Sequence, residues 1–325
     1  MIDGQGRSID YLRISVTDRC NLRCVYCMPP EGVEWMPHDD MLSYEEIIRL
    51  CTLFARRGIR KVRLTGGEPL ARKGLAQLVA GIKAIDGIES IAMTTNGIAL
   101  ADQLPDLLAA GLTAVNVSLD TLDRAQYAAI TRRDKLPQAL EGLYAALDAP
   151  GLRVKLNCVP MGDNDEQLVP LAALARDHDL AVRYIELMPI GLGGDLPGRT
   201  EEQVRAKLEE AFGPMAPCDD SLGAGPGHYF TVPGFVGKIG FISAMTHQFC
   251  HQCNRVRLTA TGFLKTCLQY ETGVDLRALL RSGAGDEAID QAIAAAILQK
   301  PLRHHFCDAA GQREDERRNM NQIGG

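Results

Sequence analysis

The sequence predicts an α/β fold built around a parallel sheet or barrel, because strand-like runs alternate with helical stretches six times between residues 11 and 187. The strand candidates are Tyr11–Val16, Lys61–Thr65, Ser90–Thr95, Ala114–Leu119, Val154–Val159 and Val182–Leu187. A glycine precedes several of these strands, where a helix must end, namely Gly58, Gly87, Gly111 and Gly151. In such folds the functional site lies at the carboxyl ends of the strands.

Helix signals fill the intervals between the strands. Ser43-Tyr-Glu-Glu46 predicts a capping box, and Arg57-Gly58 predicts the end of the same helix. The other helix candidates are Leu75–Ile85, Leu100–Ala110, Arg124–Ile130, Leu136–Leu147 and Glu166–Asp177.

The pattern changes after about residue 190. One more helix is expected after Thr200, followed by strand-like segments near Tyr229–Val232 and Lys238–Ile242. We therefore expect a partial barrel over residues 1–190 and an appended C-terminal region over residues 191–325.

Composition and charge exclude several classes of protein. The 325-residue chain carries a net charge of −6, so it has no overall basic field for nucleic acid. No stretch approaches the ~18 continuous apolar residues of a membrane helix. The N-terminal residues lack an apolar signal core, so a cytoplasmic location is expected.

Ten cysteines are unusual for a chain in that compartment, where clustered thiols indicate metal ligands or redox groups. Six of them form two groups, residues 20–27 and residues 250–267. The other four stand alone and are predicted to be small buried hydrophobic residues: Cys51, Cys158, Cys218 and Cys307.

The first group, Cys20-x3-Cys24-x2-Cys27, directly follows the first predicted strand. Three thiolates do not complete a structural zinc site, which takes four ligands. They do suit a 4Fe–4S cluster with one iron left open for another ligand. A zinc knot or three buried thiols is the alternative, and it is disfavoured because the three thiols lie in a polar loop.

The second group, Cys250, Cys253 and Cys267, also offers three thiolates, one fewer than a structural zinc site takes. Zinc has a stronger claim here, because His247 or His251 would complete a closed site with three cysteines and one histidine. We prefer a second 4Fe–4S cluster, whose open iron would bind a nitrogen or oxygen of a substrate.

Cations recur at alternating positions of the predicted strands. The residues concerned are Arg13, Lys61, Arg63, Lys155, Arg255 and Arg257. Because both faces of a strand in a parallel sheet are normally apolar, such cations need an anion to compensate their burial. A triphosphate would do so, and no Walker phosphate loop is present. Small or flexible residues at strand ends join the same predicted site: Thr94, Ser118 and Met188.

Four segments together resemble the GTP 3′,8-cyclase family of the radical S-adenosylmethionine (SAM) superfamily. They are residues 11–29, 64–70 and 249–258 and the terminal Gly324-Gly325. The resemblance implies an incomplete (β/α)6 TIM-like barrel of the radical SAM type, with a C-terminal extension that carries a second cluster. It implies SAM contacts at Tyr26, Gly67, Ser118 and Met188, and GTP contacts at Arg13, Arg63, Thr94, Lys155, Arg255 and Arg257. It assigns the SAM cluster to Cys20, Cys24 and Cys27, the substrate cluster to Cys250, Cys253 and Cys267, and catalytic roles to Arg13, Arg255, Arg257, Gly324 and Gly325.

The resemblance also implies a reaction. A 5′-deoxyadenosyl radical would abstract the ribose 3′ hydrogen of GTP, and a lyase reaction would give (8S)-3′,8-cyclo-7,8-dihydroguanosine 5′-triphosphate. This is the first step of molybdenum cofactor biosynthesis. An external electron donor, a homodimer and a downstream cyclic pyranopterin monophosphate synthase are expected with it. The alternatives are a peptide-modifying radical SAM maturase and a non-catalytic zinc-binding protein. Residues Leu192–Pro226 match no motif and receive no role.

Overall fold

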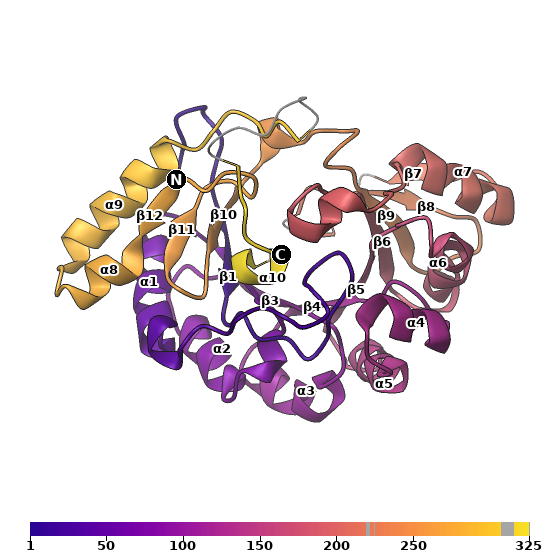
Figure 1. Cartoon of the computed structure of the whole chain (residues 1–325), viewed down its shortest axis with the longest axis horizontal. Helices are drawn as coiled ribbons and strands as arrows, with labels where there is room; N and C mark the ends of the chain where they lie inside the picture. Colours follow the sequence, from indigo (N-terminus) through magenta and orange to yellow (C-terminus); the bar gives the residue numbers. More distant parts are fainter. Residues whose placement is uncertain (219–221, 224, 307–314, 325) are drawn as a thin grey trace.

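The computed structural model describes residues 1–218, 222–223, 225–306 and 315–324. Its centre is a mixed sheet with the strand order β12-β11-β10-β1-β2-β3-β4-β5-β6-β9-β8-β7. The strands are β1 Tyr11–Ser15, β2 Lys61–Thr65, β3 Ser90–Thr95, β4 Ala114–Ser118, β5 Arg153–Cys158, β6 Ala181–Ile185, β7 Ala216–Cys218, β8 His228–Thr231, β9 Lys238–Ile242, β10 Arg255–Leu258, β11 Phe263–Lys265 and β12 Gly273–Asp275. Figure 1 shows them as an open, curved sheet with helices on its outer side.

The six predicted strand–helix repeats are confirmed, with strand and helix ends within about two residues of those expected. The helices are α1 Tyr44–Arg56, α2 Leu75–Lys83, α3 Leu100–Ala109, α4 Arg124–Thr131, α5 Leu136–Leu147, α6 Leu168–Asp177, α7 Glu201–Phe212, α8 Leu276–Arg281, α9 Asp286–Leu298 and α10 Met320–Ile323. Both predicted caps form, since Ser43 and Thr200 each make a reciprocal capping box with the residue three positions later.

The C-terminal region belongs to the same sheet as the repeats. Strand β10 pairs in parallel with β1, and β9 pairs in parallel with β6, so that the repeats are extended at both edges. These pairings satisfy main-chain groups that β1 and β6 would otherwise leave open. The strand order runs from β12 to β7 without a closing pair, so the sheet is open, as expected for an incomplete barrel. The proposed division at residue 190 remains a prediction, although the sheet runs continuously across it.

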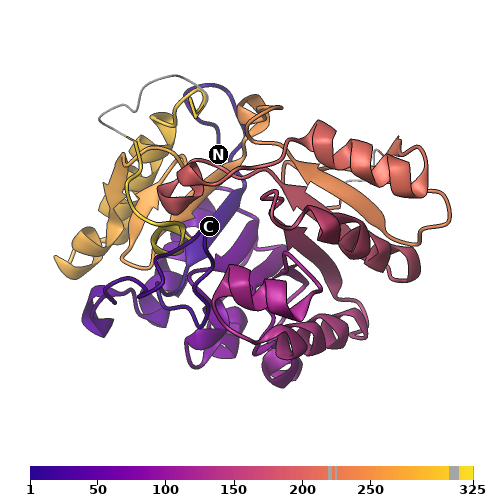
Figure 2. The same ribbon diagram turned by 45° about the vertical axis from the view of Figure 1, so that its right-hand side comes forward.

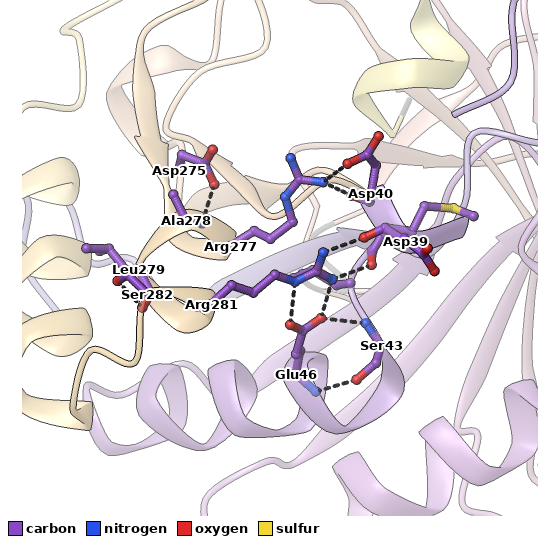
Figure 3. Close-up of polar contacts among 12 residues, drawn as sticks. Asp39, Asp40, Ser43, Glu46, Asp275, Arg277, Ala278, Leu279, Arg281 and Ser282 are labelled. Atoms are coloured by element: carbon purple, nitrogen blue, oxygen red, sulfur yellow. Dashed lines mark hydrogen bonds and ion pairs between the residues drawn. The ribbon is translucent and has the colours of Figure 1, made fainter. Parts of the chain in front are cut away.

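Figure 3 shows how α8 joins the beginning of the barrel. Arg281 Nε lies 2.9 Å from Glu46 Oε1, and Arg277 Nη1 lies 3.0 Å from Asp40 Oδ1. Glu46 also accepts from the Ser43 main-chain N–H at 2.8 Å, so the same carboxylate caps α1 and holds α8. The C-terminal region is thus fixed to the helix that follows the first cysteine loop.

The strand cores are apolar, as the alternating pattern requires. Leu12 and Ile14 are fully buried, whereas Arg13 between them faces the inner side of the sheet. Figures 1 and 2 both place α10, near the C-terminus, on this inner side next to β1. Within the described ranges, no helix has the length and apolar character needed to cross a membrane.

Candidate active site

A cavity of about 280 Å³ lies against the inner face and carboxyl ends of the parallel strands. Most of the residues that the sequence assigned to the site line it: Arg13, Tyr26, Arg63, Thr94, Ser118, Lys155, Met188, Cys250, Cys253, Arg255, Arg257 and Cys267. The lining comes from both the repeats and the C-terminal region. The residues predicted from separate motifs are therefore brought to one place, because β10 lies beside β1.

A row of arginines crosses three neighbouring strands. Arg257 of β10 is in register with Arg13 of β1, which is in register with Arg63 of β2. Arg63 donates to the hydroxyls of Tyr11 and Thr94, the latter at 3.3 Å. Because residues in register point to the same face of a sheet, three guanidinium groups meet on the cavity side.

The charges in this row disfavour one another. Burial and the neighbouring Arg255 lower the pKa of Arg257 to about 10. Burial and Arg257 also lower the pKa of Arg13 well below its ordinary value. Burial and Arg183 lower the pKa of Lys155 to about 7. A buried group of cations with depressed pKa values is the arrangement that a bound polyanion would stabilise.

The pKa of Tyr11 also shows the effect of these positive charges. Burial alone would raise the pKa of its phenol, but the positive charges of Arg63 and Arg13 outweigh burial and leave the pKa below the ordinary value. Tyr11 was not predicted to belong to the site, because its place in a strand offered no signal beyond its sharing a face with Arg13.

The first cysteine group occupies the loop after β1, and its three side chains are half-buried. The Cys27 N–H donates to the Cys24 carbonyl at 2.9 Å, and the Leu22 N–H donates to Cys20 Sγ at 3.4 Å. Burial raises the pKa of Cys20 to about 11 and that of Cys27 to about 12. Such thiols become thiolates only when a positive centre compensates them, and iron would do so.

In the described ranges, no three His, Cys, Asp or Glu side chains converge on a point as ligands of a single metal ion do. A four-iron cluster is larger than one ion, so its thiolates need not converge on one point. The three cysteines of the short loop, with Cys20 Sγ accepting a main-chain N–H bond, fit such a cluster.

Close packing explains why residue 67 is a glycine. A Cβ at this position would lie 2.4 Å from the Arg19 oxygen and 2.6 Å from the Asp18 oxygen. The Gly67 N–H also donates to the Thr17 carbonyl at 2.8 Å. The turn after β2 therefore presses directly on the cysteine loop, which only glycine permits. Gly67 itself is not among the residues that line the cavity.

Glu68 is a buried residue that the sequence analysis quoted only as part of its motif. Its side chain accepts from Thr95 Oγ1 and from the Asn96 N–H, each at 2.7 Å. Burial raises its pKa to about 7. It therefore ties the end of β2 to the end of β3, beneath the cysteine loop.

Tyr26 reaches from the cysteine loop to the end of β4. Its hydroxyl donates to Asp120 Oδ2 at 2.8 Å, and Asp120 Oδ1 accepts from the Val159 N–H at 2.8 Å. Burial raises the pKa of Asp120 to about 6. The ring of Tyr26 is thereby held at the cavity wall, near Ser118 and Met188, which line the same cavity.

The second cysteine group comes from two segments. Cys250 and Cys253 lie at the short 3-10 helix η5, Cys250–Gln252, and Cys267 follows β11. Burial acts to raise the pKa of Cys253, but Arg255 and Lys300 outweigh it and lower the pKa to about 6. His247 Nδ1 lies 3.5 Å from Glu201 Oε2, and His251 is exposed. Among the described residues, no three His, Cys, Asp or Glu side chains form a site for a single metal ion, so neither histidine completes a closed zinc site there.

The tail enters the same cavity. Gly324 accepts a hydrogen bond from Arg257 Nη1 at 3.0 Å, and Met320 lines the cavity. Gly324 has φ +73°, and a Cβ there would lie 2.9 Å from Ser15 Cβ. Gly325, also assigned to the site, lies outside the described residues.

Several residues of the cavity wall were not predicted from the sequence. Arg183 donates to Asn157 Oδ1 at 3.0 Å, and both line the cavity. The unassigned stretch Leu192–Pro226 also takes part, because Lys155 donates to the Leu222 carbonyl and Pro226 lines the cavity. The Arg183 side chain could have been found by the alternation that identified Lys155, but Asn157 and Pro226 carried no comparable signal.

The solitary cysteines are not all alike. Cys51 and Cys158 are fully buried, as predicted. The prediction was wrong for Cys218, which is half-buried because it ends the edge strand β7. Cys307 lies outside the described residues.

An open parallel sheet, a three-cysteine loop after its first strand and a cation-lined cavity at the strand ends define the class of radical SAM enzymes. Residues 14–175 match the family model "Radical SAM superfamily", and residues 180–306 match "Molybdenum Cofactor Synthesis C". The chain is 48% identical to the GTP 3′,8-cyclase of Pelotomaculum thermopropionicum and 46% identical to that of Heliobacterium modesticaldum, in each case with 100% of both chains covered. The chain belongs to the GTP 3′,8-cyclase family.

Among solved structures, the chain is similar to Streptococcus suis SuiB bound to S-adenosylmethionine. The TM-score is 0.60 at 14% identity, covering 86% of this chain and 66% of that one. This likeness confirms the α/β fold of the radical SAM class. Members of that class use a 4Fe–4S cluster and SAM.

Proposed function

We propose that this enzyme converts GTP to (8S)-3′,8-cyclo-7,8-dihydroguanosine 5′-triphosphate, as a lyase that performs the first step of molybdenum cofactor biosynthesis. One observation carries the proposal. A single cavity is lined by the arginine row, by Tyr26, Ser118 and Met188, and by the second cysteine group. The residues assigned to the triphosphate and to SAM therefore share one cavity with the second set of thiols, while the first set lies in the loop that carries Tyr26.

The SAM end is assigned to the loop after β1. Cys20, Cys24 and Cys27 would hold the first cluster, and Gly67 would keep its turn packed on their loop. Tyr26, Ser118 and Met188 would contact SAM. When bound, the reduced cluster and SAM supply the radical that removes the 3′ hydrogen of GTP.

The GTP end is assigned to the cations. Arg13, Arg63, Lys155, Arg255 and Arg257 would bind the triphosphate, since guanidinium groups pair with phosphate oxygens through two parallel hydrogen bonds. Thr94, which already accepts from Arg63, would add a hydroxyl contact.

The second cluster is assigned to Cys250, Cys253 and Cys267, with its open iron toward the guanine ring. All three line the cavity, and Arg255 lies over the Phe249 ring at 5.0 Å from its centroid, next to Cys250. The tail residue Gly324 would extend the wall beside Arg257 and exclude water from the reacting atoms. The catalytic role that the family resemblance implies for Gly325 is proposed with it.

The remaining assignments follow from the family. We propose a cytoplasmic homodimer that takes electrons from an external donor and passes its product to a cyclic pyranopterin monophosphate synthase. The peptide-modifying alternative has no specific support, because the likeness to SuiB at 14% identity concerns the fold. The alternative of a non-catalytic zinc-binding protein is disfavoured by the full-length similarity to GTP 3′,8-cyclases at 48% and 46% identity.

The test is anaerobic incubation of the reconstituted enzyme with GTP, SAM and a reductant. Formation of 5′-deoxyadenosine together with a cyclised GTP product is expected, and ATP in place of GTP should give no cyclised product. Cleavage of SAM at the same rate with and without GTP, and no nucleotide product, would overturn the proposal.

A further inference from the structure

Two buried cations outside the arginine row contact the chain beside each cysteine of the second group. Arg7 Nη1 donates to the Cys250 carbonyl at 2.8 Å. Lys300 Nζ donates to the Arg255 carbonyl at 2.9 Å, two residues after Cys253, and to the carbonyl of Thr266, which directly precedes Cys267.

Arg7 is itself held in one orientation. Its Nε lies 2.7 Å from Asp3 Oδ2, and both side chains are almost completely buried. The same guanidinium donates to the Pro301 carbonyl at 2.7 Å and to the Leu302 carbonyl at 3.0 Å. Arg7 therefore joins Cys250 to the chain that directly follows Lys300. We call Arg7 and Lys300, with these contacts, the two-cation brace.

The two-cation brace connects segments that are far apart in the sequence. Cys253 and Cys267 lie on either side of the β10–β11 hairpin, and a single ammonium group spans its two ends. Cys250 is held by a residue from the N-terminus. Three thiols drawn from two segments can keep a fixed triangle only if their main chains are tied together, and these hydrogen bonds do that.

Charge gives a second reason for burying the two cations. Lys300 is 3% exposed, and its ammonium donates to main-chain oxygens of the cysteine segments. Burying a cation is costly unless negative charge lies close by. A cluster ligated by thiolates supplies such charge, and residues around a metal ligand set commonly tune its affinity and potential.

We propose that Arg7 and Lys300 are positioning residues for the second iron–sulfur cluster: they hold Cys250, Cys253 and Cys267 in a fixed triangle and place positive charge beside it. This inference rests on the second cluster of the proposed function. The brace contacts main-chain oxygens of the cysteine segments, so its effect should appear in cluster retention even when GTP and SAM are absent.

The test uses the full chain with Cys20, Cys24 and Cys27 changed to Ala, so that only the second group can hold iron. After anaerobic reconstitution, this parent should bind about four irons. Iron loss to a chelator is then followed by absorbance. Lys300→Met should accelerate loss on the order of tenfold. Lys83→Met, an exposed lysine at the end of α2, is the matched control and should leave the rate unchanged.

Two further variants separate hydrogen bonding from folding and charge. Lys300→Gln keeps a donor without the charge, so it should retain iron better than Lys300→Met but show a more negative reduction potential than the parent. If Lys300→Met does not fold, Arg7→Gln tests the Cys250 side of the brace by the same chelator assay and is expected to lose iron faster.

The outcomes are distinguishable. A parent that binds no iron overturns the second cluster, and the brace with it. A parent that binds iron, with Lys300→Met or Arg7→Gln losing it no faster than Lys83→Met, overturns the brace alone and leaves the proposed function standing.

Discussion

Arg257 donates a hydrogen bond from Nη1 to the main-chain oxygen of Gly324, 3.0 Å away, on the inner side of the sheet. The two residues are far apart in the sequence and meet because β10 lies beside β1 and the tail returns over it. The contact joins the proposed triphosphate site to the C-terminus. It gives Gly324 a structural position that its sequence alone does not specify.

Gly324→Ala should impair the reaction without removing either cluster. Its Cβ would approach Ser15 Cβ and Thr65 Oγ1 at 2.9 and 3.0 Å, and the φ of +73° disfavours any side chain. We expect kcat/KM to fall at least about tenfold, or ~1.4 kcal/mol. Gly283→Ala is the control, because Gly283 has φ +81° with nothing within 4 Å. Equal activity in both variants would contradict a role for the tail.

Arg257→Ala should abolish measurable cyclisation while iron content stays at the wild-type level, and Arg255→Ala should do the same. Each change removes a charge-assisted pair with phosphate, so GTP affinity should fall on the order of tenfold to a hundredfold. Equilibrium binding of GTP and iron analysis together measure this. Arg281→Ala, which removes the surface pair with Glu46 in Figure 3, should leave GTP binding unchanged. Wild-type GTP affinity in Arg257→Ala would refute the phosphate assignment.

GTP affinity should fall as pH rises above about 7. Burial and Arg183 lower the pKa of Lys155 to about 7 in the free cavity, and a neighbouring triphosphate would raise it. Below pH 7 the lysine is protonated in both states, so its contribution is complete. Above pH 7 binding must take up a proton, and affinity declines by up to about tenfold per pH unit until the pKa of the complex is passed.

Calorimetry in buffers of different ionisation enthalpy measures that proton uptake at pH 8. Lys155→Met should bind GTP more weakly and should show less uptake, with only the titration of GTP itself remaining. If the variant takes up as many protons as the wild type, Lys155 is not the group responsible.

Iron analysis should separate the two cysteine groups. The wild-type chain should hold about eight irons after anaerobic reconstitution, and the triple Ala variant of either group should hold about four. The variant lacking Cys20, Cys24 and Cys27 should also lose all SAM cleavage. Zinc in place of iron in the variant that retains Cys250, Cys253 and Cys267 would favour the closed zinc site instead.

The repeats and the cysteine groups were predictable because both are local. Each strand of the first six alternates or runs apolar over five or six residues. Helices α1 and α4 begin at side-chain caps, and α3 ends just before Gly111. Cys20, Cys24 and Cys27 are close in sequence, so their spacing predicts a cluster loop. The arginines were found because a cation at a strand position conflicts with the apolar pattern around it.

The C-terminal region was predicted less well. Its strands β11 and β12 are three residues each, and α8 follows directly, which leaves no period long enough to recognise. Cys218 was expected to be buried, yet it lies at the end of an edge strand, and edge position is a property of the whole sheet.

The sequence by itself determined the parallel α/β class, the two groups of three thiols, and the cations that imply an anionic substrate. These properties depend on residue type and short spacing. Only the tertiary structure decided that β10 lies beside β1 and that Arg257 stands in register with Arg13 and Arg63. Strand neighbours and buried cation contacts such as that of Lys300 depend on pairings between distant segments. Those pairings depend on the strand edges and charges that the repeats by themselves leave without partners.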